Sequence, residues 1–241
     1  MKLIAALFLL LWCFLLLSAC ANSPLSKHTI PHRTDTSSIN QLAKADFDRI
    51  ADMELESNTQ SLRTLMIKLY KRNPRDLAKS NFSNAEKRTS SIFDEIIKHQ
   101  WQFKQLQNKQ DIEALFLTFD ADFQGDRVLA FIVGLQTMLV KAHNNKTAFY
   151  LTDNLDPQSI YNVARNIEIA AWKLSNSRDA NGNLYLLSNE ISETDRNLSF
   201  EREFGKMIGR TDLYAIALAE KSQRLISRIA QSLASAVFLP F

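Results

Sequence analysis

The chain has 241 residues, and its 29 Lys and Arg residues against 26 Asp and Glu residues give a formal net charge of +3. So even a balance produces no strong positive field, and we expect no nucleic acid partner. Only five glycines and five prolines occur. This scarcity of helix breakers predicts an all-α, bundle-like domain, with room for one small two-stranded β ribbon.

Residues 1–19 have the three-part pattern of a secretory signal peptide. Lys2 supplies a positive charge, residues 3–17 are almost continuously apolar, and Ser18 and Ala19 are the small residues that a signal peptidase accepts. The apolar run covers about 15 residues, whereas a transmembrane helix needs about 20. We therefore expect this segment to be removed rather than retained as a membrane span.

The stretch Leu17-Ser18-Ala19-Cys20 closes the apolar run. It resembles the lipobox of bacterial lipoproteins, which implies that Cys20 becomes the lipidated mature N-terminus. Two or three acyl chains would anchor the chain permanently, because each buried methylene contributes about 0.8 kcal/mol. Inner-membrane lipoproteins carry an aspartate just after the cysteine, whereas Ala21 and Asn22 follow here. The resemblance therefore implies the outer membrane of a Gram-negative bacterium, facing the periplasm. The alternative is an ordinary signal peptide that leaves Cys20 as a free thiol.

Residues 20–37 are predicted to be a lipidated flexible tether, and residues 38–241 a helical periplasmic domain. The tether segment contains two prolines, many hydroxyl residues and no hydrophobic period. His28 and His32 have a spacing that could bind a metal on a helix, but Pro31 between them opposes that helix.

The first half of the domain is predicted to be helical. Between residues 38 and 72, apolar residues recur at spacings of three and four, the period of a helix. Asn73 before Pro74 ends this pattern, because a residue before proline avoids the α conformation. Asn73 could cap a short helix over residues 75–79, and Ser83 could cap another that reaches Gln107.

The most apolar segment of the mature chain covers residues 128–140. A short helix is predicted just before it, over residues 111–119. The segment is too short to span a bilayer, so we interpret it as a central buried helix. The aspartates between positions 120 and 126 are predicted to cap its start. Gly134 would let a neighbouring helix approach closely, at a cost in helix propensity of about 1 kcal/mol.

A further helix and a β ribbon are predicted next. Asp156 and Pro157 provide a cap and a first-turn proline for a helix that reaches about residue 174. The dipeptide Asn181-Gly182 is a turn signal, so residues 184–187 could form a strand that pairs with residues 148–152.

Two final helices are predicted over residues 200–207 and 212–238. Gly209 separates them, and Thr211 is the predicted N-cap of the second.

No metal or cofactor is predicted. A calcium loop beginning at Asp120 fails because its twelfth position is Phe131, and one beginning at Asp179 has Leu184 where a glycine is required. Cys13 lies in the removed segment, so no second cysteine remains for a disulfide or a cysteine metal site.

Catalytic motifs are also missing from the sequence. There is no G-x-S-x-G elbow, no H-E-x-x-H and no phosphate-binding glycine loop. His99 and His143 are the two histidines outside the tether, and we interpret both as structural. We therefore predict that the chain is not an enzyme.

Two segments are candidates for an interaction or ligand surface. The first is a basic stretch around Lys71, Arg72 and Arg75, which continues to Lys79, Lys87 and Arg88. The second is the apolar C-terminal tail with Phe238 and Phe241, which either packs onto the domain or forms an exposed partner site.

Three functions follow in order of preference. The first is a non-catalytic adaptor, scaffold or assembly factor that is held at the outer membrane by Cys20 and binds another envelope protein. The second is a carrier of a lipid or other apolar ligand, suggested by 15 phenylalanines and the apolar segment 128–140. The third is an envelope hydrolase with an unfamiliar site.

Overall fold

The computed structural model describes residues 46–146, 155–192, 196–222 and 237–241. All of these residues belong to one unit, Ala43–Phe241. The predicted signal peptide, the predicted lipidation residue Cys20 and the predicted tether lie outside the described residues, as does the predicted strand at residues 148–152.

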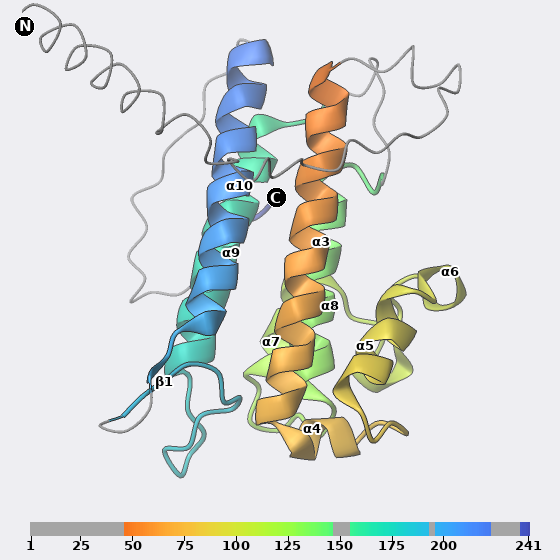
Figure 1. Ribbon diagram of the computed structural model, residues 1–241, viewed down its shortest axis with the longest axis vertical. Coiled ribbons are helices and arrows are strands. Elements are labelled where there is room, and N and C mark those ends of the chain that lie inside the picture. The colour runs from red at the N-terminus through yellow and green to blue at the C-terminus, as the bar shows by residue number, and fades with distance from the viewer. Residues whose placement is uncertain (1–45, 147–154, 193–195, 223–236) are drawn as a thin grey trace, which may run out of the picture. The chain divides into compact units, whose positions relative to one another are not determined.

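The described residues form a mainly helical domain (Figure 1), so the predicted all-α class with one small β ribbon is confirmed. Its longer helices are α3 (Asp46–Arg72), α8 (Arg127–Ala142), α9 (Pro157–Asn176) and α10 (Ser199–Ser222). Its shorter helices are α4 (Pro74–Ala78), α5 (Ala85–Phe93), α6 (Ile96–His99), η1 (Lys104–Leu106) and α7 (Asp111–Thr118). The ribbon pairs β1 (Glu190–Ile191) antiparallel with β2 (Arg196–Asn197).

Helix α8 is the core element, as predicted from its hydrophobicity. Its neighbours α3, α7 and α9 all contact it. Its Phe131 packs edge-to-face against Phe119 and Phe204, with ring centroids 6.2 Å apart in both pairs. The predicted cap is also present, because Asp126 accepts a hydrogen bond from the Leu129 amide at 2.9 Å. Among the helices that the structure describes, none combines the length and hydrophobicity that crossing a bilayer requires.

Gly134 lies where α7 approaches α8 most closely. A methyl group added at this position would lie 2.6 Å from Leu115 Cγ and 2.9 Å from the Asp111 carbonyl oxygen. We expect Gly134→Ala to lower the free energy of unfolding by about 1 to 3 kcal/mol despite the better helix propensity of alanine, because the backbone of α7 would have to shift. Chemical denaturation measures the change.

The matched control is Gly209→Ala in α10, because Gly209 is exposed and has nothing within 4 Å of an added methyl group. Because no neighbouring atom clashes with the added methyl group, the higher helix propensity of alanine should raise the free energy of unfolding by up to about 1 kcal/mol. Changes of the same sign in both variants would contradict the packing described for α7 and α8.

The prediction of a single helix from Ser83 to Gln107 is wrong, because this region contains three short helices, α5, α6 and η1. Asn84 is the cap, since it accepts the Lys87 amide at 2.8 Å. Helix α5 then ends at Phe93, and the left-handed backbone of Gln100 and Trp101 separates α6 from η1. This break lets the Trp101 ring bury itself edge-on against Phe93, at 5.2 Å between centroids.

The end of the chain corrects two further predictions. Helix α10 runs without interruption through Gly209, and Thr211 lies inside it rather than at a cap. Packing against α3 and α9 keeps the helix continuous despite the glycine. Residues 184–187 also do not form the predicted strand: within the described residues Leu184 makes an isolated bridge with Arg178, and the strands lie at 190–191 and 196–197. The predicted pairing with residues 148–152 lies outside the described residues.

Candidate functional site

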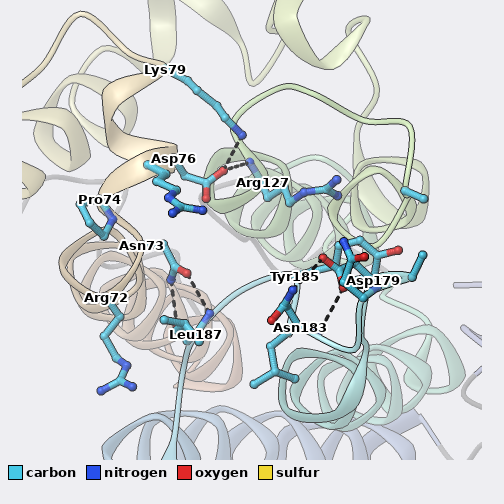
Figure 2. A pocket seen from close by; sticks show the side chains of 15 residues that line it. Arg72, Asn73, Pro74, Asp76, Lys79, Arg127, Asp179, Asn183, Tyr185 and Leu187 are labelled. Carbon is cyan, nitrogen blue, oxygen red and sulfur yellow. Dashed lines mark hydrogen bonds and ion pairs between the residues drawn. The ribbon is translucent and has the colours of Figure 1, made fainter.

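A solvent-open pocket of about 950 Å³ lies where α3 meets α4 (Figure 2). Its walls come from three parts of the chain: the α3–α4 junction, the residues around the start of α8, and the loop 179–187. Its lining consists of Arg72, Asn73, Pro74, Arg75, Asp76, Lys79, Ala121, Arg127, Asp179, Ala180, Asn181, Asn183, Leu184, Tyr185 and Leu187.

Asn73 joins two of these walls. Its side-chain amide donates to the carbonyl oxygens of Leu69 and Leu187, and its Oδ1 accepts the Leu187 amide at 2.8 Å. The predicted capping role is therefore wrong in detail: Asn73 stands at the N-cap of α4 but makes no side-chain cap bond. Its side chain instead fixes the loop, which is over a hundred positions away in the sequence.

Replacing Asn73 with alanine should lower the free energy of unfolding by about 2 to 4 kcal/mol, because three hydrogen bonds are lost and the polar backbone atoms of Leu187 lose their partner. Urea denaturation measures this change. Asn181→Ala removes an exposed amide from the same pocket and should change stability by less than about 0.5 kcal/mol. Equal effects would show that Asn73 does not hold the loop.

Asp76 and Arg127 build the wall at the start of α8. Asp76 Oδ1 accepts the Arg127 backbone amide at 2.9 Å and the Lys79 ammonium at 3.1 Å. The Lys79 ammonium also donates to the Gly125 carbonyl at 2.8 Å. The Arg127 guanidinium donates to three carbonyls in the segment 117–123 and lies over the Tyr185 ring. This wall is thus held by charged groups that are already bonded.

Asp179 shapes the third wall. Its Oδ1 accepts the backbone amides of Asn181 and Asn183, both at 2.9 Å, and these hydrogen bonds hold the pKa of the Asp179 carboxyl below its usual value. Gly182 follows with a positive φ of 80°, which a glycine adopts without strain. The predicted turn at Asn181-Gly182 is therefore confirmed.

The electrostatic balance of the lining is positive. Arg72, Arg75, Lys79 and Arg127 face two carboxylates, those of Asp76 and Asp179. Arg72 donates to Glu190 of β1 at 2.8 Å, while the exposed Arg75 has no ion pair or hydrogen bond through its side chain within the described residues. Arg75 is therefore the least neutralised charge of the pocket.

A buried carboxylate network lies behind the pocket. Tyr70 donates to Asp126 Oδ2 at 2.6 Å, and an Arg88 guanidinium nitrogen lies 3.8 Å from the same oxygen. Asp126 is fully buried, and burial raises the pKa of its carboxyl from 3.8 to about 6. Burial also raises the pKa of the Tyr70 hydroxyl. Tyr70 lies in the last turn of α3, and Asp126 caps the start of α8. The hydrogen bond between them therefore joins α3 to the core helix.

A second buried network ties the other end of α8 to α3 and α10. Glu54 Oε1 accepts the Asn58 amide at 2.5 Å and the Thr211 hydroxyl at 2.6 Å, and its Oε2 lies 3.2 Å from His143 Nε2. The His143 ring stacks on Tyr214, with centroids 5.8 Å apart. His143 is the C-cap residue of α8, and its ring is completely buried.

The structure divides the basic stretch between the pocket and a surface outside it, and it packs the C-terminal tail onto the domain. Arg72 and Arg75 line the pocket, whereas Lys71 is exposed outside the lining and pairs with Glu86. Phe238 is 7% exposed and packs edge-on against Phe116, so its ring is not on the surface. Phe241 is partly buried, and the Lys141 ammonium lies 5.1 Å from the centre of its ring, at the opposite end of α8 from the pocket.

Two buried amides explain why the tail packs onto the domain. Asn162 donates to the Pro240 carbonyl at 2.7 Å, and Asn166 exchanges two hydrogen bonds with the backbone of Leu239. Both asparagines belong to α9, where the sequence showed only an apolar stripe.

Sequence reasoning missed most of the loop wall and the position of Arg127. The Asn181-Gly182 signal identified the turn, but no local pattern places Asn183 or Tyr185 in the same pocket as Arg75. The one cue was Asn73, a polar residue that proved to be buried at the end of an apolar helix.

Among the described residues, no group of three or more His, Cys, Asp or Glu side chains is arranged to hold a metal ion. The chain matches no protein-family model, no curated protein and no solved structure. The pocket and its charges must therefore be interpreted from their own chemistry.

Proposed function

We propose that this protein is an outer-membrane lipoprotein whose helical domain acts as a non-catalytic adaptor for another envelope protein. Cys20 would provide the anchor and residues 20–37 the tether. The observation that carries the adaptor role is the position of the pocket at the C-terminal end of α3, the helix through whose N-terminal end the chain enters the domain. With 27 residues, α3 separates these two ends by about 40 Å. Such spacing suits a domain that presents a docking site away from its tether.

The packing of the core favours an adaptor over a carrier. A carrier needs unfilled apolar space between helices, but Phe131 of α8 is packed by two aromatic rings, and Gly134 lies directly against Leu115. Nine of the fifteen residues that line the pocket have charged or amide side chains, which suit a polar partner better than an acyl chain.

The histidines give the hydrolase hypothesis no support. Nε2 of His99 lies 2.7 Å from the Ile92 carbonyl, and its Nδ1 accepts the Trp101 amide at 2.9 Å. His143 is enclosed in the buried network around Glu54. In these positions both rings serve the packing of the domain.

Site-specific crosslinking in living cells tests the adaptor function. A photoreactive residue in place of Ala121, which is exposed on the pocket wall, leaves every charge of the pocket intact. We expect it to capture a discrete envelope protein in the full-length chain. The control position is Glu220, exposed near the end of α10, which should not capture that protein. Recovery of the uncrosslinked chain from both positions, or the same products from both, would refute the proposal.

A further inference from the structure

The pocket holds a cationic group with unused hydrogen-bonding capacity. Arg75 is exposed on the lining, and its guanidinium donates no hydrogen bond within the described residues. Arg72, three positions earlier, donates from Nη2 to Glu190, and its Nη1 donates no hydrogen bond within the described residues. Two guanidinium groups on one wall are suited to bidentate binding of carboxylates or phosphates.

The two carboxylates of the lining do not cancel this charge. Asp76 is occupied by Lys79 and by the backbone amide of Arg127. Asp179 is occupied by the backbone amides of its own turn. Four cationic side chains against two carboxylates still leave the lining positive, and Arg75, which has no ion pair within the described residues, contributes most to the attraction of an incoming anion.

The opposite wall suits a peptide better than a small ion. Asn181 and Asn183 are exposed there, and primary amides can donate to and accept from a peptide backbone. Leu187 adds a side chain that is 46% exposed and can contact an apolar residue of a partner. A volume of about 950 Å³ is also far larger than a single oxyanion requires.

We infer that this pocket binds an acidic segment of a protein partner, with Arg72 and Arg75 contacting its carboxylates. The inference rests on the adaptor function proposed above and specifies the chemistry that its docking site recognises. Arg75 is the principal contact, because Arg72, like Lys79 and Arg127, already makes a bond within the domain.

Fluorescence anisotropy tests this inference with the full-length chain in a nonionic detergent. The probe is a labelled peptide of alternating glutamate and glycine, and the neutral control is the corresponding peptide of glutamine and glycine. We expect saturable binding of the acidic peptide only. The double variant Arg72→Gln/Arg75→Gln should weaken it at least about tenfold, and Arg75→Gln alone should weaken it too without breaking any contact of the described residues.

The matched control is Lys71→Gln/Lys87→Gln, which removes the same charge from exposed lysines outside the pocket lining. It should change binding by less than about twofold, because surface charges act weakly at a distance in salt. Equal weakening in both double variants would overturn the inference. So would stronger, arginine-dependent binding of dihexanoyl phosphatidylglycerol in competition with the peptide, since the ligand would then be a lipid headgroup.

The adaptor proposal and the acidic-ligand inference can fail separately. If the acidic peptide does not bind while the residue at position 121 still captures a partner, the inference is wrong and the adaptor function stands. If the peptide binds in an arginine-dependent way but position 121 captures nothing, the pocket chemistry is supported and the adaptor function is not.

Discussion

Replacing Glu54 with alanine is expected to lower the free energy of unfolding by about 3 to 5 kcal/mol, because removing this buried acceptor leaves several buried hydrogen-bonding groups unsatisfied. Glu54 is 5% exposed and accepts hydrogen bonds from Asn58 and Thr211. Its other oxygen faces His143. The substitution would leave three buried polar groups without this partner at the junction of α3, α8 and α10. Urea denaturation followed by circular dichroism gives the value.

Glu56→Ala is the matched control, because Glu56 lies on the same helix with an exposed side chain. It should change stability by less than about 0.5 kcal/mol. A loss of less than about 1 kcal/mol for Glu54→Ala would mean that the buried network does not hold the three helices together.

Asp126 should make the stability of the domain depend on pH. Because burial raises the pKa of this carboxyl from 3.8 to about 6, the folded chain binds its proton more tightly than the unfolded chain. This contribution to stability is complete below about pH 4 and is lost as the pH rises through about 6. The pKa difference corresponds to about 3 kcal/mol.

The variant Asp126→Asn lacks this titration and isolates its effect from those of other carboxyl groups. The difference in unfolding free energy between wild type and variant should shift by about 3 kcal/mol in favour of the variant between about pH 4 and 7. Denaturation curves at several pH values measure it. A difference that stays constant with pH would show that Asp126 titrates normally in the folded chain.

These two networks explain how α8 is fixed within the domain. Asp126 caps the first turn of α8 and accepts a hydrogen bond from Tyr70 of α3. His143 follows the last turn of α8 and faces Glu54, which also belongs to α3. Both ends of the core helix are therefore tied to α3. The bond between Tyr70 and Asp126 joins the start of α8, which carries Arg127, to the end of α3, which carries Arg72.

Local sequence patterns predicted the elements whose signals lie within a few residues. The apolar run of α8, its cap Asp126 and the Asp156-Pro157 start of α9 all depend on neighbouring residues, and all three are confirmed. The predicted break at Gly209 is wrong. The helix-propensity cost of this glycine, about 1 kcal/mol, is small compared with the stabilisation that a 24-residue helix gains by packing on two neighbours.

The candidate site was less predictable because its contacts are long-range. Arg72 and Arg75 were recognisable as part of a basic stretch, but their placement in one pocket with Asn183 depends on the hydrogen bonds between Asn73 and Leu187. Likewise, Thr211 was interpreted as a cap because its bond to Glu54, 157 positions away, leaves no local trace.

The most direct test of the central claim is the mass of the mature N-terminal peptide, measured on chain isolated from the outer membrane of a Gram-negative host. We predict a peptide that begins at Cys20 and carries a diacylglyceryl group on the sulfur and an acyl chain on the amine. The Cys20→Ser variant should be absent from the membrane fraction. A wild-type peptide that begins at Cys20 with an unmodified thiol, or a chain found in the soluble periplasm, would contradict the account of a tethered adaptor.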